Sequence, residues 1–153
     1  SAAAEAATRV VNPRIGIVLS SKGGALAQMV PAFRMGLGGK IGSGTQLMSW
    51  IALEDVLGGM HHILKTQELK GAVNLTAPAP VTNLEFAKTL GKVLGRPSLV
   101  PLPGSIVKLA MGEMGESLLL SSAHVLPQRL LQTGYAFKRR NLEGALRAEL
   151  NRG

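Results

Sequence analysis

The sequence predicts an α/β fold, and three observations lead to this class. Residues 10–19 form a run rich in β-branched and apolar side chains, the composition of a strand buried on both faces of a parallel sheet. Residues 72–76 form a second short strand-like run. Other segments carry apolar residues at helical spacing, most clearly at 82–94. Buried strands that alternate with amphipathic helices are typical of α/β proteins.

The first quarter of the chain contains an expected helix end, a strand and a helix. Residues 1–7 are rich in alanine and predict the end of a helix that begins earlier. The strand at 10–19 follows, and glycines then precede a helix that Pro31 is expected to kink. The apolar positions that predict this helix are Leu26, Met29, Val30, Phe33 and Leu37. Residues 38–46 are rich in glycine and predict a turn between short strands.

A strand at 47–51 and a helix after it are expected next. Glu54 and Asp55 lie where carboxylates favour the start of a helix. One apolar face of this helix is predicted, and it comprises Leu53, Val56, Leu57, Met60 and Leu64. For Asp55 the simplest interpretation is this helix N-terminal role.

The helix at 82–94 has the clearest boundaries. Thr82 and Glu85 have the spacing of a capping box, and Gly95 followed by Pro97 ends the helix. Its apolar stripe comprises Phe86, Leu90, Val93 and Leu94.

The last third of the chain is predicted to form short helices. After an extended stretch at 98–100, helices are expected around 103–111, 113–119 and 123–132, and a last helix begins after Asn141 as N-cap. The segment Pro101-Leu102-Pro103 marks the one boundary that composition indicates. We therefore divide the chain into a domain at 1–100 and a small, mostly helical domain at 101–153.

Composition excludes several classes of protein. Apolar residues make up 46% and charged residues 17% of the 153 residues, a globular balance without a segment long enough to span a bilayer. The net charge is +8, but the basic residues are scattered and aromatic residues make up only 3%, so nucleic acid is not expected as the main partner. Cysteine is absent, which fits a cytoplasmic protein or, in a eukaryote, one in an organelle stroma.

Several motifs in a fixed order resemble a known family. The strand Arg14-Ile15-Gly16-Ile17-Val18-Leu19 is followed by Gly23-Gly24-Ala25, Gly36-Leu37-Gly38-Gly39, Gly42-Ser43-Gly44, Trp50-Ile51 and Asp55, and later by Asn74-Leu75-Thr76 and Thr133-Gly134-Tyr135. This order resembles the extended short-chain dehydrogenases/reductases, in the branch of NAD-dependent epimerase/dehydratase-like proteins with a small C-terminal domain of uncharacterised function. The resemblance covers about residues 9 to 150. It implies the C-terminal part of a Rossmann-type, NAD(P)-binding fold with a substrate lobe.

Two functional motifs of that family are not found in the sequence. The glycine-rich phosphate loop, which follows the first strand of the sheet and precedes a long helix, has no counterpart. The Tyr-x-x-x-Lys pair is also absent, because the only tyrosine, Tyr135, has Arg139 four residues later and lies in a different element. The resemblance places both motifs before residue 1. We therefore expect no catalytic residue in this chain.

The resemblance assigns five residues to the site of the intact enzyme. Arg14 and Val18 are implied as cofactor-binding residues, although a salt bridge and a buried strand position are the alternatives. Ser49, Trp50 and Ile51 are implied as substrate-binding residues, and core packing is the alternative for Trp50. No metal site is expected, since His61 and His62 are adjacent on a helix and point in different directions.

The sequence thus predicts the C-terminal half of an NAD(P)-dependent epimerase or oxidoreductase that supplies a pocket wall. Its cofactor would be NAD or NADP, and its substrate a small molecule such as a nucleotide sugar. The expected partner is the N-terminal half or a second copy of the chain, with no nucleic acid and no membrane. A non-catalytic nucleotide-sensing or scaffold protein on the same fold is the alternative, because fold does not determine function. A basic nucleic-acid-binding module is a weaker one.

Overall fold

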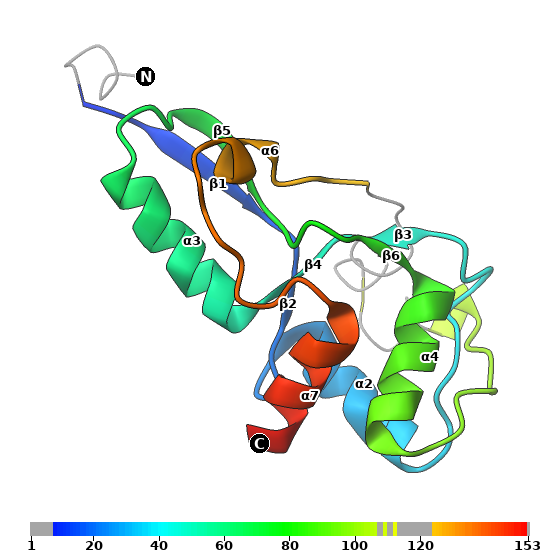
Figure 1. Ribbon diagram of the computed structural model, residues 1–153. Coiled ribbons are helices and arrows are strands. Elements are labelled where there is room, and N and C mark those ends of the chain that lie inside the picture. The colour runs from blue at the N-terminus through cyan, green and yellow to red at the C-terminus, as the bar shows by residue number, and fades with distance from the viewer. Residues whose placement is uncertain (1–7, 107–108, 110–111, 113–123, 153) are drawn as a thin grey trace.

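The computed structural model of the protein describes residues 8–106, 109, 112 and 124–152 (Figure 1). Its described strands are β1 (Val11–Ile15), β2 (Ile17–Leu19), β3 (Leu47–Met48), β4 (Trp50–Ala52), β5 (Gly71–Leu75) and β6 (Val81–Thr82). Its described helices longer than one turn are α2 (Gly24–Arg34), α3 (Leu53–Lys65), α4 (Asn83–Leu94), α6 (Gln128–Gln132) and α7 (Leu142–Arg152). The mixed α/β class predicted from the sequence is confirmed.

The predicted strand at 10–19 changes its neighbour halfway along. Its first part, β1, pairs in parallel with β5, and its second part, β2, pairs in parallel with β4. Gly16 is the one residue between the two parts. Its amide donates to the Leu75 carbonyl at 3.0 Å, whereas the amide of the next residue, Ile17, donates to the Ser49 carbonyl at 2.8 Å. The strands β1 and β5 therefore separate at Gly16. Beyond this residue β4, in place of β5, is the neighbour of the continuing strand β2.

Burial along this strand differs from the expectation of two covered faces. In β2, Ile17 and Leu19 are buried, as predicted. In β1 no residue is fully buried, and Ile15 is 48% exposed. The expectation was wrong for β1 at its carboxyl end, because Arg14 and Ile15 there border a cavity.

Two apolar clusters hold the elements together. The larger one joins α2, α4 and α7 to β2 and β4 around the fully buried Trp50, whose indole N–H donates to the Ala79 carbonyl at 2.9 Å. The smaller one lies between α3, β5 and α6, and contains Ile63, Leu75 and Leu130. Figure 1 shows the corresponding arrangement, with α3 alongside the β1–β5 pair and α2, α4 and α7 gathered at the opposite end.

Helix α3 forms where predicted, but the side that it turns toward the core is not the predicted apolar side. Its buried residues are Asp55, Gly59 and Ile63. The predicted apolar face is largely exposed instead, at 41% for Leu53, 66% for Leu57, 39% for Met60 and 70% for Leu64, with Val56 half-buried. The prediction of this face was wrong because glycine allows the opposite side of the helix to approach β5 closely. A Cβ on Gly59 would collide with the Leu75 side chain.

The two helix caps predicted from the sequence are confirmed. Thr82 Oγ1 accepts a hydrogen bond from the Glu85 amide at 3.1 Å, and Gly95 ends α4 with a φ of 67°. Asn141 Oδ1 accepts from the Gly144 amide at 3.0 Å at the start of α7. In both helices a side-chain oxygen satisfies an amide that has no partner within the helix.

The other helices predicted after residue 101 are only partly described. Residues 104–106 are helical, and the predicted helix at 113–119 lies outside the described residues. The helix predicted at 123–132 begins only at Gln128, since residues 124–127 have no regular secondary structure. No helix in the described ranges is long and apolar enough to cross a membrane.

Candidate functional site

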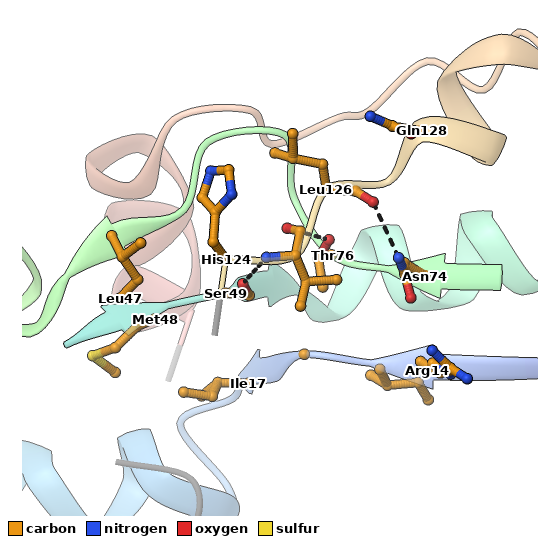
Figure 2. Close-up of a pocket in the computed structure, with 13 residues that line it drawn as sticks. Arg14, Ile17, Leu47, Met48, Ser49, Asn74, Thr76, His124, Leu126 and Gln128 are labelled. Carbon is orange, nitrogen blue, oxygen red and sulfur yellow. Dashed lines mark hydrogen bonds between the residues drawn. The ribbon is translucent and has the colours of Figure 1, made fainter. Parts of the chain in front are cut away.

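A cavity of about 680 Å³ lies at the carboxyl ends of β1 and β5, where these strands separate. Residues 14–17, from the end of β1 to the start of β2, and residues 47–49, which are β3 and the residue after it, form two of its sides. Asn74 and Thr76 from the end of β5, with residues 124–126 and Gln128, complete the lining (Figure 2). A crevice beyond the carboxyl ends of diverging parallel strands is the usual place for a ligand in α/β proteins.

Gly16 permits the close approach of the strands at this cavity. A Cβ at this position would lie 2.6 Å from the Ser49 carbonyl oxygen and 2.9 Å from the Thr76 Cγ2 atom. Both distances are shorter than a real side chain tolerates, so no other residue fits without a shift of the backbone. The geometry of the cavity wall therefore depends on the absence of a side chain at Gly16.

Three polar side chains hold the segment 124–128 against the strands. Ser49 Oγ accepts from the Val125 amide at 3.1 Å, and Thr76 Oγ1 donates to the Val125 carbonyl at 3.2 Å. Asn74 Nδ2 donates to the Leu126 carbonyl at 3.3 Å. Figure 2 shows these three bonds between the β3, β5 and 124–128 sides of the cavity. They satisfy backbone groups that a segment without regular secondary structure would otherwise leave without partners.

The lining carries positive and neutral groups. Arg14 is exposed and lies beside Asn74, its register partner in the parallel pair β1–β5. His124 and Gln128 are also exposed, and the described lining contains no aspartate or glutamate. Apolar side chains from Ile17, Met48 and other residues form the remaining wall. A concave site with an apolar wall and a guanidinium suits a ligand that carries a negatively charged group.

The structure brings two of the five predicted site residues to this cavity. Arg14 and Ser49 line it, while Val18, Trp50 and Ile51 do not. Val18 is half-buried and packs against the smaller apolar cluster. Trp50 and Ile51 are fully buried in the two clusters. Cofactor contact by Val18 and substrate contact by Trp50 and Ile51 stay predictions.

Four polar lining residues were given no role from the sequence. Asn74 and Thr76 lie at the end of a predicted strand, and polar residues at that place are a signal that the sequence does contain. His124 and Gln128 lie within the stretch at 123–132 that was predicted to be helical, but the helix begins only at Gln128. Only their position in the folded chain brings them to the cavity.

A second polar cluster fixes the C-terminal segment to α3. The buried Asp55 carboxylate accepts from the Tyr135 hydroxyl at 2.7 Å and from the amides of Lys138 and Arg139 at 2.8 and 2.9 Å. Burial and the neighbouring Asp55 carboxylate raise the pKa of Tyr135 well above its ordinary value. The cluster lies outside the cavity lining, and we assign it a structural role beyond the helix-start role expected for Asp55.

No group of three or more potential ligands among the described His, Cys, Asp and Glu residues could hold a metal ion.

Comparison with known proteins places the chain in a family. Residues 102–149 match a family model described as a domain of unknown function, DUF1731. The human epimerase family protein SDR39U1 is 44% identical over 140 residues, which cover 92% of this chain and 48% of that protein. The chain thus spans about half the length of the curated relatives it matches.

Solved structures agree with this relationship. The crystal structure of human SDR39U1 with NADPH matches with a TM-score of 0.87 and 41% identity, over 94% of this chain and 49% of that one. A nucleoside-diphosphate sugar epimerase from Corynebacterium glutamicum matches with a TM-score of 0.75 and 29% identity, over 97% of this chain and 27% of that one. UDP-glucose 4-epimerase from Thermus thermophilus, solved with NAD, has a TM-score of 0.64 and 18% identity, over 97% and 49% of the two chains, and supports the fold alone.

The fold, the matched domain and the sequence identity lead to one assignment. The chain is the C-terminal part of an epimerase family protein, with the fold that this part has in the NAD(P)-binding epimerases.

Proposed function

We propose that this chain supplies the substrate-side wall, and part of the cofactor site, of an NAD(P)-dependent epimerase or oxidoreductase. The observation that carries the proposal is the cavity at the carboxyl ends of β1 and β5, with Arg14 in its lining. Its size is within the range of small-molecule sites. The substrate class that fits best is an anionic small molecule, and a nucleotide sugar is one such molecule.

The residues of the cavity fit a nicotinamide nucleotide. Such a cofactor carries phosphate groups, and Arg14 offers a guanidinium without a competing carboxylate in the described lining. Asn74 lies beside Arg14 in register. The nicotinamide, when bound, supplies hydride transfer. This chain's own residues bind and orient, and none of them is proposed to transfer a proton.

The edges of the β1–β5 pair support an N-terminal half as the partner. The Gly71 amide donates to the Val10 carbonyl. Backbone groups of successive residues in a strand point to opposite edges, so the carbonyls of Lys70 and Ala72 point to the outer edge of β5. Arg129 donates to both of their carbonyls, at 2.5 and 2.9 Å, and thereby blocks this edge. The outer edge of β1 has no neighbouring strand among the described residues. We propose that strands of the N-terminal half pair there.

The proposal is tested by amide NMR of the chain titrated with NADPH and, separately, with UDP-glucose. Binding at the cavity is expected to shift the amide signals of Gly16, Ser49 and Thr76. Affinity should be low, because the glycine-rich phosphate loop is absent from these 153 residues. Shifts that avoid the cavity, or none with either probe at millimolar concentration, would contradict the proposal.

A pair of arginine variants provides the control. Arg14→Gln is expected to reduce the shifts at the cavity severalfold, because it removes the charge that attracts phosphate. Arg34→Gln removes an equal charge at the end of α2, outside the cavity lining, and should leave them unchanged. Equal effects of both substitutions would indicate unspecific attraction by the net charge of +8.

A further inference from the structure

The segment 124–128 forms one wall of the cavity and comes from a different part of the chain than the other walls (Figure 2). It lies within residues 102–149, which match the domain of unknown function. The other described lining residues all lie between positions 14 and 76. The cavity is therefore bordered on one side by that domain.

Both backbone groups of Val125 are bound by side chains that are distant in the sequence. Ser49 Oγ accepts from the Val125 amide at 3.1 Å, and Thr76 Oγ1 donates to the Val125 carbonyl at 3.2 Å. Asn74 Nδ2 donates to the carbonyl of the next residue, Leu126, at 3.3 Å. Residues 124–127 have no regular secondary structure, so these bonds hold the segment in its path along the cavity.

Two of the three side chains that bind this segment are hidden from a ligand. Thr76 is 1% exposed and Ser49 is 6% exposed. The single hydroxyl hydrogen of Thr76 is used in its bond to Val125. Thr76 therefore acts on a ligand only through the segment that it holds. The same burial and the same bonding partner indicate an indirect role for Ser49 as well.

The side chains that reach the cavity from this segment differ in kind from the charge on the strand side. His124 and Gln128 are exposed and can both donate and accept hydrogen bonds, and the half-buried Leu126 is apolar. Arg14 carries its guanidinium on β1, and Figure 2 shows it on the strand side, away from the segment. The strand side attracts any anion, whereas the segment offers a combination of groups that only a matching ligand satisfies.

We propose that the segment 124–128 is the specificity-determining wall of the site, and that the three side chains bonded to its backbone are positioning residues. In this arrangement Arg14 attracts the phosphate groups of a nucleotide ligand, while His124 and Gln128 contact the rest of that ligand. The inference rests on the proposed function. It gives the domain of unknown function a part in selecting the substrate.

The test compares two probes by amide NMR of the cavity signals. UDP-glucose carries phosphates, a nucleoside and a sugar, whereas inorganic pyrophosphate carries the charge alone. Thr76→Val keeps the Cγ2 methyl beside Gly16 but removes the hydroxyl that holds Val125. It is expected to weaken UDP-glucose binding by about three- to tenfold, the equivalent of one hydrogen bond, and to leave pyrophosphate binding unchanged. A general loss of structure would weaken both.

Three variants serve as controls. Thr76→Ser retains a hydroxyl at the same position and should bind UDP-glucose like the parent chain. Thr133→Val removes a hydroxyl that donates to the Arg129 carbonyl at 2.8 Å outside the cavity lining, so neither probe should be affected. Arg14→Gln should weaken the binding of both probes, because it removes the charge that attracts phosphate.

A double variant tests whether Thr76 acts through the segment. His124→Ala removes a proposed ligand contact and should weaken UDP-glucose binding by a similar factor. If Thr76 acts by holding that contact in place, Thr76→Val has a smaller effect in the His124→Ala background than in the parent chain. Fully additive losses would show that the two residues act independently.

Several results would overturn the inference while the proposed function stands. They are additive losses in the double variant, unchanged UDP-glucose binding in Thr76→Val, equal weakening of both probes by Thr76→Val, and the same loss in Thr76→Ser. Binding of NADPH at the cavity without binding of UDP-glucose would also overturn it. Absence of cavity shifts with both nucleotides would contradict the proposed function and the inference together.

Discussion

At the scale of single residues, Gly16 determines how the cavity is built. It is the residue at which the strand changes its partner from β5 to β4, and its missing side chain leaves room for the Ser49 carbonyl. A strand interior ordinarily disfavours glycine, so its presence marks a close approach of another backbone. The sequence contains this glycine within a motif, but the neighbour that requires it is distant in the chain.

We predict that Gly16→Ala lowers the free energy of unfolding by about 1–3 kcal/mol, the usual cost of forcing extra volume into a packed site. The added methyl would lie 2.6 Å from the Ser49 oxygen. Urea denaturation measures the effect. Gly144→Ala is the control, because it adds a methyl in the first turn of α7 with no atom closer than 3.9 Å. The control should stabilise the chain by about 0.5–1 kcal/mol, and a Gly16 variant that behaves like it would contradict the prediction.

Tyr135 gives a prediction for alkaline pH. Burial and the Asp55 carboxylate raise the pKa of this hydroxyl above its unfolded value of about 10. The folded state therefore keeps the proton at a pH where the unfolded state has lost it. The stabilisation is complete below pH ~10 and is lost as pH rises from there toward the folded pKa.

The parent chain should consequently lose stability above pH ~10 more steeply than Tyr135→Phe, as measured by urea midpoints across that range. Lysine residues titrate in both proteins, so the difference between them isolates Tyr135. It is the only tyrosine, and its ionisation can be followed by ultraviolet absorbance. Tyrosinate that forms in the folded chain near pH ~10 would refute the raised pKa.

At the scale of elements, local signals were sufficient where a few neighbouring residues decide the structure. The start of α4 depends on Thr82 and Glu85, which are three residues apart, and the hydrogen bond between them forms as predicted. The face of α3 is a different case. Its leucines are arranged as a core-facing stripe, but Gly59 and Asp55 contact partners from β5 and from the C-terminal segment. Those contacts are invisible to helical periodicity.

Thr82→Ala is predicted to destabilise the chain by about 1 kcal/mol, because the Glu85 amide loses its partner. Thr89→Ala serves as the control in the same helix. Thr89 donates to the Glu85 carbonyl within the helix, and alanine has the higher helix propensity, so little change is expected. Urea midpoints compare the two. Equal midpoints for the parent and Thr82→Ala would show that the cap contributes nothing to stability.

At the scale of the whole molecule, the chain combines a cavity wall with an open strand edge. The cavity lining includes β1, β3, the end of β5 and residues 124–128, which are brought together from four parts of the sequence. Arg129 blocks the outer edge of β5, while β1 has no second neighbour among the described strands. This asymmetry agrees with a chain that spans about half of its relatives.

We predict that the 153-residue chain alone has no dehydrogenase or epimerase turnover. The Tyr-x-x-x-Lys pair and glycine-rich loop of the resembling family are absent from its sequence. Spectrophotometric assays with NAD(H) and NADP(H) over a panel of sugar nucleotides and carbonyl compounds check this. A UDP-glucose 4-epimerase assayed alongside establishes the sensitivity. Turnover that co-purifies with the chain through successive columns would show that it contains catalytic groups of its own.

The sequence by itself determined the features that depend on short stretches or on ordered motifs. It predicted the α/β class, the helix at 82–94 with its cap, the helix after Asn141 and the family, because each is encoded by neighbouring residues or by their order. It also selected Arg14 and Ser49, which do line the cavity.

Only the tertiary structure decided which surfaces meet. It placed Asn74, Thr76, His124 and Gln128 around one cavity, and it turned the leucines of α3 outward. The physical reason is that hydrophobic spacing indicates which side of an element is apolar, but not what that side contacts. Whether a face is buried depends on the partners that long-range packing supplies, and in α3 the glycine side made the closer fit.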